Sequence, residues 1–191
     1  MVVSGPTATA YEWLYREWAD DTGDLWLCVC FVRDVTPGEA LRRIGVTPGP
    51  ATDGFGFGVA AYPARGGTFL VEDGWGHVVY HQARTLSAGT RAAALFVTSD
   101  DSAFAYFADG RSITAFNLYD CRARTGTEPD RLLPDLRELE METSYEDHGW
   151  TGAPVTAALA LAERATGVHM SRSRYEGTAL FGSTGHLDPY A

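Results

Sequence analysis

The sequence predicts an α+β fold: a mostly antiparallel sheet of about six strands with helices packed on one face. Two observations carry this prediction. Helical patterns lie toward both ends of the chain, and the middle holds short strand patterns joined by hairpin turns rather than by crossover helices. With 191 residues, the chain is expected to form a single domain over residues 1–170, followed by a tail over 171–191 that docks or stays mobile.

The first elements follow from apolar spacing and capping residues. Apolar side chains recur at helical spacing over residues 7–19, where Thr7 is the expected N-cap: Tyr11, Leu14, Tyr15 and Trp18. Residues 25–33 predict a strand that is apolar on both faces, which is typical of the centre of a sheet. A second helix is expected over 36–45, because its first turn has the residues of a capping box: Thr36, Pro37 and Glu39.

The remaining elements complete the count of about six strands. Five strand patterns follow the second helix: 55–62, 67–72, 91–98, 102–108 and 111–118. The pair Asp109-Gly110 is the strongest hairpin signal, because a two-residue turn of this kind needs left-handed backbone at both positions. Helices are predicted at three further places: 79–88, 129–140 and 152–166. Pro134 lies inside the second of these and is expected to split or kink it.

Composition excludes several functions. The formal net charge of −10 disfavours nucleic acid as a partner and fits a protein that meets a basic surface. The chain has no lysine, which excludes a P-loop lysine and a lysine Schiff base. Cys28 and Cys30 lie in the apolar run LWLCVCFV and are expected to be buried, reduced side chains. No signal peptide or membrane span is expected, so the predicted location is the cytoplasm, and no cofactor or metal is expected.

Residues 71–91, VEDGWGHVVYHQARTLSAGTR, contain two carboxylates, two histidines, a tryptophan and two arginines within 21 positions. Two interpretations stay open for five of these residues: Glu72, Asp73, Trp75, His77 and His81. They form either a binding pocket that uses the two imidazoles and the two carboxylates, or a tight strand exit followed by a short helix that ends at Gly89. The second interpretation is favoured, because Val78-Val79-Tyr80 separates the histidines and the glycines dictate the chain's path.

A second group of candidate residues lies near the end of an acidic run. Aromatic side chains lie beside acidic ones there, which is common at protein–protein contacts: Tyr145, Glu146, Asp147, His148 and Trp150. The alternation of glycine and phenylalanine at residues 54–58 does not match a nucleotide-binding loop, because no helix follows it. It indicates instead an edge strand, a bulge or a close approach of another backbone.

Five motifs together resemble an uncharacterised family of actinobacterial proteins with a domain of unknown function: LCVCFVRDVTPGEALRRIG, GTFLVEDGWGH, LSAGTRAAALFV, FAYFADGRSITAFN and GTEPDRLLPDLRELE. The resemblance covers residues 11–167. It implies a cytoplasmic regulatory or accessory protein, and it supplies no catalytic residue. The chain departs from the family pattern at Arg33-Asp34-Val35, where the family has an Arg-Gly turn, and in the tail after residue 170.

Three functional hypotheses follow. The leading one is a non-enzymatic module that binds another protein, with an immunity or regulatory partner as the candidates, because the chain is acidic and its loops are rich in aromatic residues. The alternative is a small-molecule-binding protein or enzyme with its pocket around residues 72–91. The third is homo-oligomerisation through the edge at 54–58.

Overall fold

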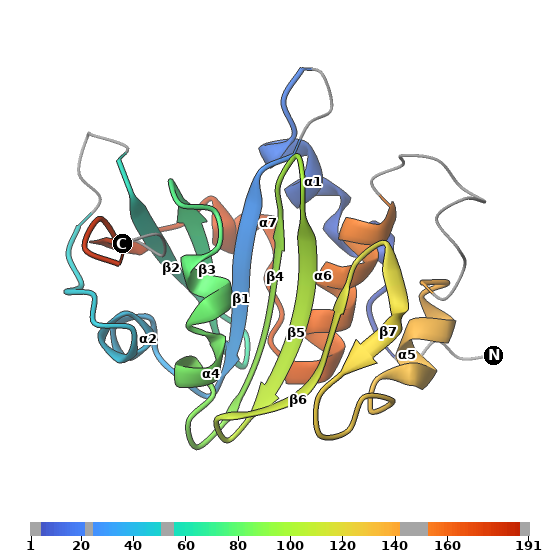
Figure 1. Ribbon diagram of the computed structural model, residues 1–191. Helices are drawn as coiled ribbons and strands as arrows, with labels where there is room; N and C mark the ends of the chain where they lie inside the picture. Colours follow the sequence, from blue (N-terminus) through green and yellow to red (C-terminus); the bar gives the residue numbers. More distant parts are fainter. Residues whose placement is uncertain (1–4, 22–24, 51–55, 142–152, 188–191) are drawn as a thin grey trace.

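The chain forms an eight-stranded antiparallel sheet (Figure 1). The computed structural model describes residues 5–21, 25–50, 56–141 and 153–187. Within these residues the strand order is β7-β6-β5-β4-β1-β3-β2-β8. The strands are β1 Leu27–Arg33, β2 Gly58–Ala64, β3 Gly67–Asp73, β4 Arg91–Val97, β5 Ser102–Ala108, β6 Arg111–Asn117, β7 Asp120–Thr125 and β8 Leu180–Ser183. The predicted α+β class is confirmed, whereas the count of about six is wrong, because β7 and β8 add one strand at each edge.

Strand β1 lies near the middle of the sheet and is buried on both faces, as its sequence predicts. It pairs with β3 on one side and with β4 on the other. Its side chains alternate between two hydrophobic clusters: Leu27, Val29 and Phe31 belong to one, and Cys28, Cys30 and Val32 belong to the other. The sheet is therefore the middle layer between two cores.

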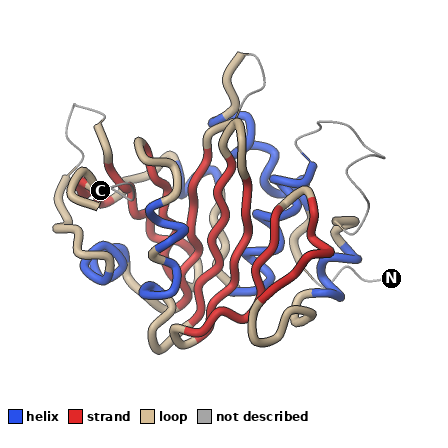
Figure 2. Tube along the Cα trace, in the orientation of Figure 1, coloured by secondary structure: helices blue, strands red, loops and turns tan. Residues whose placement is uncertain are grey.

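Helices cover both faces of the sheet, so the prediction of helices on one face is wrong (Figure 1; Figure 2). The first core contains side chains from four helices: η1 Ala8–Tyr11, α1 Glu12–Trp18, α5 Leu133–Glu138 and α6 Ala153–Thr166. The second core contains side chains from α2 Pro37–Arg43, α3 Val78–His81 and α4 Ala83–Leu86. The remaining helix of the described residues is α7 Arg172–Tyr175, and its Tyr175 packs against the first core. A strand that is apolar on both faces needs a covering layer on each side.

Local signals place several helix ends and turns correctly. The Thr36 hydroxyl accepts a hydrogen bond from the Glu39 amide at 3.4 Å, so the predicted cap of α2 is confirmed. Asp109 and Gly110 have φ angles of 49° and 72° and join β5 to β6 in a two-residue hairpin, as predicted. Thr7 makes no side-chain cap, and its helix starts with a 3-10 turn.

Two predicted helices differ in extent from those observed. Helix α5 is shorter than the expected span 129–140, because Pro134 lies in its first turn, where the missing N–H costs nothing, and thus starts the helix instead of splitting it. The helix predicted over 79–88 is present as two short pieces, α3 and α4. Gly89 follows them with a φ of 67°, as its predicted left-handed position requires.

The tail docks on the sheet through residues 180–183. Strand β8 pairs with β2 at Gly58–Ala61. A side chain at Gly58 would collide with the ring of Phe181, so the glycine permits this close approach. The edge suggested for homo-oligomerisation is residues 54–58, of which Gly54 and Phe55 lie outside the described residues. Its last residue, Gly58, is paired with β8 within the chain, and β2 is not an edge strand of the described sheet.

Candidate functional site

The carboxylate of Glu72 is buried beneath the loop that follows β3. The residue is 2% exposed. Its Oε1 accepts a hydrogen bond from the Gly76 amide and its Oε2 accepts one from the Val79 amide, each at 2.9 Å. Burial raises the pKa of Glu72, and the hydrogen bonds from the Val79 amide, the Cys28 thiol and the Gly76 amide oppose this rise. Glu72 therefore ties the loop to the first turn of α3.

Glycine and tryptophan shape the loop above this carboxylate. Gly74 and Gly76 have φ angles of 112° and 85°, which side-chain-bearing residues rarely adopt. A Cβ atom at Gly74 would lie 2.8 Å from Cα of Phe57. The Trp75 indole N–H donates to the Thr184 carbonyl at 3.1 Å, and its ring stacks on Phe57 with a centroid distance of 4.0 Å. The loop is thus held from below by Glu72 and from the side by Trp75.

The two histidines of the segment are neighbours. The rings of His77 and His81 meet edge to face, with centroids 5.2 Å apart. Burial, and then the charge of His77, lower the pKa of His81 from its ordinary value of 6.5, so its imidazole is neutral at pH 7. Asp73 is the last residue of β3 and pairs in register with Gly58.

The structure therefore gathers Glu72, His77 and His81 in one segment, but the carboxylate is engaged by backbone amides. In the described residues, no group of three or more histidine, cysteine, aspartate or glutamate side chains is arranged to hold a metal ion. The geometry matches the interpretation of this segment as a strand exit leading into a short helix. A ligand-binding use of the same side chains stays a prediction.

Two exposed aromatic side chains flank the same loop, and neither was among the predicted site residues, although Phe57 lies in the edge at 54–58 that was suggested for homo-oligomerisation. Trp26 is 55% exposed and Phe57 is 44% exposed. The Trp26 ring lies 3.7 Å from the position of a Cβ atom on Gly76, while Phe57 stacks on Trp75. We call Trp26, Phe57 and Trp75 the aromatic platform. The sequence predicted that Trp26 belongs to the apolar strand 25–33. It predicted that Phe57, which has a glycine on each side, belongs to the strand 55–62.

A buried polar network that the sequence did not predict joins the first helical segment to α6. The Tyr11 hydroxyl donates to Glu163 Oε2 at 2.7 Å, and His169 Nδ1 lies 2.9 Å from the same oxygen. Tyr11 is fully buried, and Glu163 is 9% exposed. These residues are 152 and 6 positions apart in sequence, so no local pattern signals their contact.

The cysteines do not present a reactive thiol. Cys28 and Cys30 are buried and unbridged, as predicted. Burial raises the pKa of both thiols, with the charge of Glu72 contributing at Cys28. Cys121 is also buried, and its thiol donates to the Met141 carbonyl at 2.9 Å.

The second group of candidate residues, Tyr145, Glu146, Asp147, His148 and Trp150, lies outside the described residues. The structure therefore does not place this predicted partner-binding loop. No helix in the described part of the chain combines the length and the apolar character that a membrane span requires.

Fold and site together define an α+β protein whose antiparallel sheet is covered on both faces and carries an aromatic platform at one end of β1. The chain belongs to DUF6461, a family of unknown function, whose model matches residues 53–181. The match starts later than the expected residue 11 and continues past residue 167 into β8. No match was found among curated proteins or among solved structures.

Proposed function

We propose that this chain is a non-enzymatic module that binds another protein through the aromatic platform. The observation that carries the proposal is the exposure of Trp26 and Phe57, at 55% and 44%, beside a loop that is fixed in place. Large exposed aromatic side chains are typical anchors of protein interfaces, because they bury much apolar area and lose little conformational entropy.

The loop beneath the platform supports this proposal. Glu72 fixes the backbone at Gly76 and Val79, and the Trp75 indole is bonded to Thr184. The aromatic rings therefore stand on a preformed surface and need little ordering when a partner binds. Preorganisation of this kind lowers the entropic cost of association.

Charge favours a basic partner. Thr98 lies beside Gly76, and its hydroxyl accepts a hydrogen bond from the Asp101 amide at 3.1 Å, so the acidic turn at Asp100 and Asp101 adjoins the platform. The whole chain has a formal net charge of −10. Negative charge around an apolar centre speeds the approach of a positively charged protein. We propose that the chain, together with this partner, has an immunity or regulatory role in the cytoplasm of an actinobacterium.

The experiment compares complexes formed by surface variants in the native cells. Tagged wild-type chain, Trp26→Ser, Phe57→Ser and Leu180→Ser are purified, and any stoichiometric partner is identified by mass spectrometry and then produced in pure form. Leu180 is the matched control, since it is 39% exposed and lies on β8 beside Gly38 of α2.

The purified partner is expected to bind wild type and Leu180→Ser equally. It should bind Trp26→Ser about tenfold or more weakly, as expected for the loss of an interface anchor. The affinity should also fall as salt rises, because the partner is basic. Equal affinity for all four chains would show that the platform is not the interface, and the absence of any stoichiometric partner would count against the module itself.

A further inference from the structure

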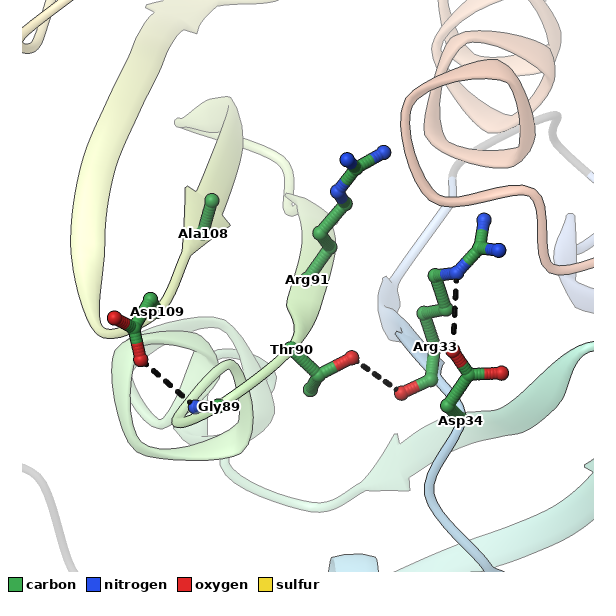
Figure 3. A pocket seen from close by; sticks show the side chains of 7 residues that line it. All are labelled: Arg33, Asp34, Gly89, Thr90, Arg91, Ala108 and Asp109. Atoms are coloured by element: carbon green, nitrogen blue, oxygen red, sulfur yellow. Dashed lines mark hydrogen bonds and ion pairs between the residues drawn. The ribbon is translucent and has the colours of Figure 1, made fainter.

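An open hollow lies at the other end of β1, where β1 ends and β4 begins (Figure 3). Its volume is about 530 Å³, within the size range of small-molecule sites. Seven residues line it: Arg33, Asp34, Gly89, Thr90, Arg91, Ala108 and Asp109. Its position is opposite to the aromatic platform, because Trp26 precedes the first residue of β1 and Arg33 is the last.

Four charged side chains line the hollow, and two of them, Arg91 and Asp109, form no ion pair with a residue that the structure describes. Arg33 Nε donates to Asp34 at 3.1 Å, and Arg33 Nη1 donates to the Thr166 carbonyl at 3.1 Å. Asp109 accepts a hydrogen bond from the Gly89 amide at 3.0 Å. Arg91, by contrast, is exposed and makes no side-chain hydrogen bond or ion pair with any residue that the structure describes. Its guanidinium offers five N–H donors to a ligand.

Arg33 and Arg91 are cross-strand neighbours. Val32 pairs with Ala92 in the register of β1 and β4, so the next opposite pair is Arg33 and Arg91. Figure 3 shows that the two guanidinium groups extend in the same direction. Like charges placed opposite each other destabilise a sheet. An anion bound between the two groups would remove this repulsion and accept hydrogen bonds from both.

The backbone around the hollow is held in shape before any ligand binds. Asp34 and Asp109 have φ angles of 52° and 49°, and they are two of the three non-glycine residues with positive φ in the described part of the chain. The Asp34 amide donates to the Gly66 carbonyl at 2.9 Å, and the Thr90 hydroxyl donates to the Arg33 carbonyl at 2.7 Å. Such uncommon backbone is often retained at binding sites.

We propose that this hollow binds the carboxylate group of a small molecule. The donors are the guanidinium of Arg91 and Nη2 of Arg33, whose Nε and Nη1 already bond to Asp34 and Thr166. A guanidinium fork matches the two oxygens of a carboxylate or of a phosphate. The carboxylates of Asp34 and Asp109 also line the hollow, and they repel a phosphate, which carries two charges on one group, more strongly than one carboxylate group of a succinate, whose two charges are on separate groups. This inference does not depend on the proposed protein partner.

The test follows the side-chain Nε–Hε signals of the arginines by ¹⁵N NMR while succinate or inorganic phosphate is added at constant ionic strength. We expect succinate to shift the Arg91 signal in a saturable way and to bind more tightly than phosphate. The affinity for succinate should fall about tenfold or more in Arg91→Gln, because charge-assisted hydrogen bonds are lost. Arg91→Lys should show an intermediate loss, since it keeps the charge without the fork.

Arg122→Gln is the matched control, because Arg122 is an exposed arginine on β7 without a described partner. It should bind succinate like wild type. Ala108→Leu keeps every charge and fills the hollow, so it should also lose binding. The proposal is overturned if succinate gives no saturable shift, if Arg122→Gln loses as much affinity as Arg91→Gln, or if phosphate binds more tightly than succinate.

Discussion

Replacing Glu72 by alanine removes the acceptor of two backbone N–H groups beneath the platform loop. Both groups lie 2.9 Å from the carboxylate oxygens, and Glu72 is 2% exposed, so water does not readily replace the carboxylate. Each buried N–H left without an acceptor costs about 1–3 kcal/mol. Relief of the carboxylate's burial offsets part of this loss, and we expect the free energy of unfolding to fall by about 2–4 kcal/mol.

Glu72→Gln separates the hydrogen bonds from the charge. Its side chain keeps a single acceptor oxygen, so one of the two N–H groups remains bonded and the expected loss is about 1–2 kcal/mol. Urea unfolding followed by tryptophan fluorescence measures both variants. With a slope of about 2 kcal/mol per molar urea, the alanine variant should unfold at about 1–2 M less urea than wild type.

The control is Glu128→Gln, since Glu128 forms an exposed pair with Arg131 at 3.5 Å. Its free energy of unfolding should stay within about 0.5 kcal/mol of wild type. If Glu72→Ala also stays within that range, Glu72 does not hold the loop and the argument for a preformed platform is wrong.

The raised pKa of Glu72 adds a pH dependence with a defined sign. Below pH 4.5 the carboxyl is protonated in both the folded and the unfolded state. As the pH rises above 4.5, the unfolded state ionises first, so the contribution of Glu72 to stability falls until the pH passes the folded pKa. The stability advantage of wild type over Glu72→Gln should therefore be larger at pH 4.5 than at pH 7, and an advantage that grows with pH contradicts this assignment.

Three other predictions concern residues in or beside the loop that follows β3. Because the pKa of His81 is lowered, the unfolded state takes up its proton first as the pH falls below 6.5, so His81→Gln should lose less stability than wild type between pH 7.5 and 5.5 in urea titrations. Gly74→Ala should lower the free energy of unfolding by about 1–3 kcal/mol, since its φ of 112° suits glycine and its new methyl meets Phe57, and calorimetry should detect a lower Tm. The Cys28 thiol should stay unlabelled by a maleimide in the folded chain and react on unfolding, because burial raises its pKa; rapid labelling of the native protein would contradict the buried position.

The elements that the sequence predicts well are those whose pattern is complete within a few residues. Strand β1 has apolar residues on both faces, and the β5–β6 hairpin has an Asp-Gly turn between alternating apolar residues. Helix α6 is buried along nearly its whole length, and its residues are apolar except for Thr156, Glu163, Arg164 and Thr166, as expected for a helix between a sheet and other helices. In each case the local signal agrees with the tertiary contacts.

The strands that the sequence missed depend on distant partners. Only Cys121 is buried in β7, whose other residues are mainly charged or exposed, so its sequence resembles a loop. Strand β8 has four residues and forms because Gly58 and Gly182 admit close approach: the ring of Phe181 fills the space at Gly58, and Val46 fills the space at Gly182. A single sequence does not show which of its glycines will meet.

In the candidate site, too, the features with a local sequence pattern were predicted, and those that depend on distant contacts were not. The glycines and Trp75 indicated a tight strand exit, and they form one. The acceptor role of Glu72 was not predicted, because it requires the backbone amides of Gly76 and Val79 to turn back toward the end of β3. The exposure of Trp26 also depends on tertiary structure, since an apolar residue beside a buried strand is ordinarily expected to be buried with it.

The arrangement of the two cores explains why the candidate surfaces lie at the ends of β1. Both faces of this strand are covered by side chains of the two clusters, so neither face is available to a ligand or partner. Its seven residues span about 20 Å, and the platform and the hollow are separated by that length. Substitutions at such a distance usually act independently. The loss of a protein partner in Trp26→Ser and the loss of succinate in Arg91→Gln should therefore occur separately, because each surface depends on its own loop and strand ends.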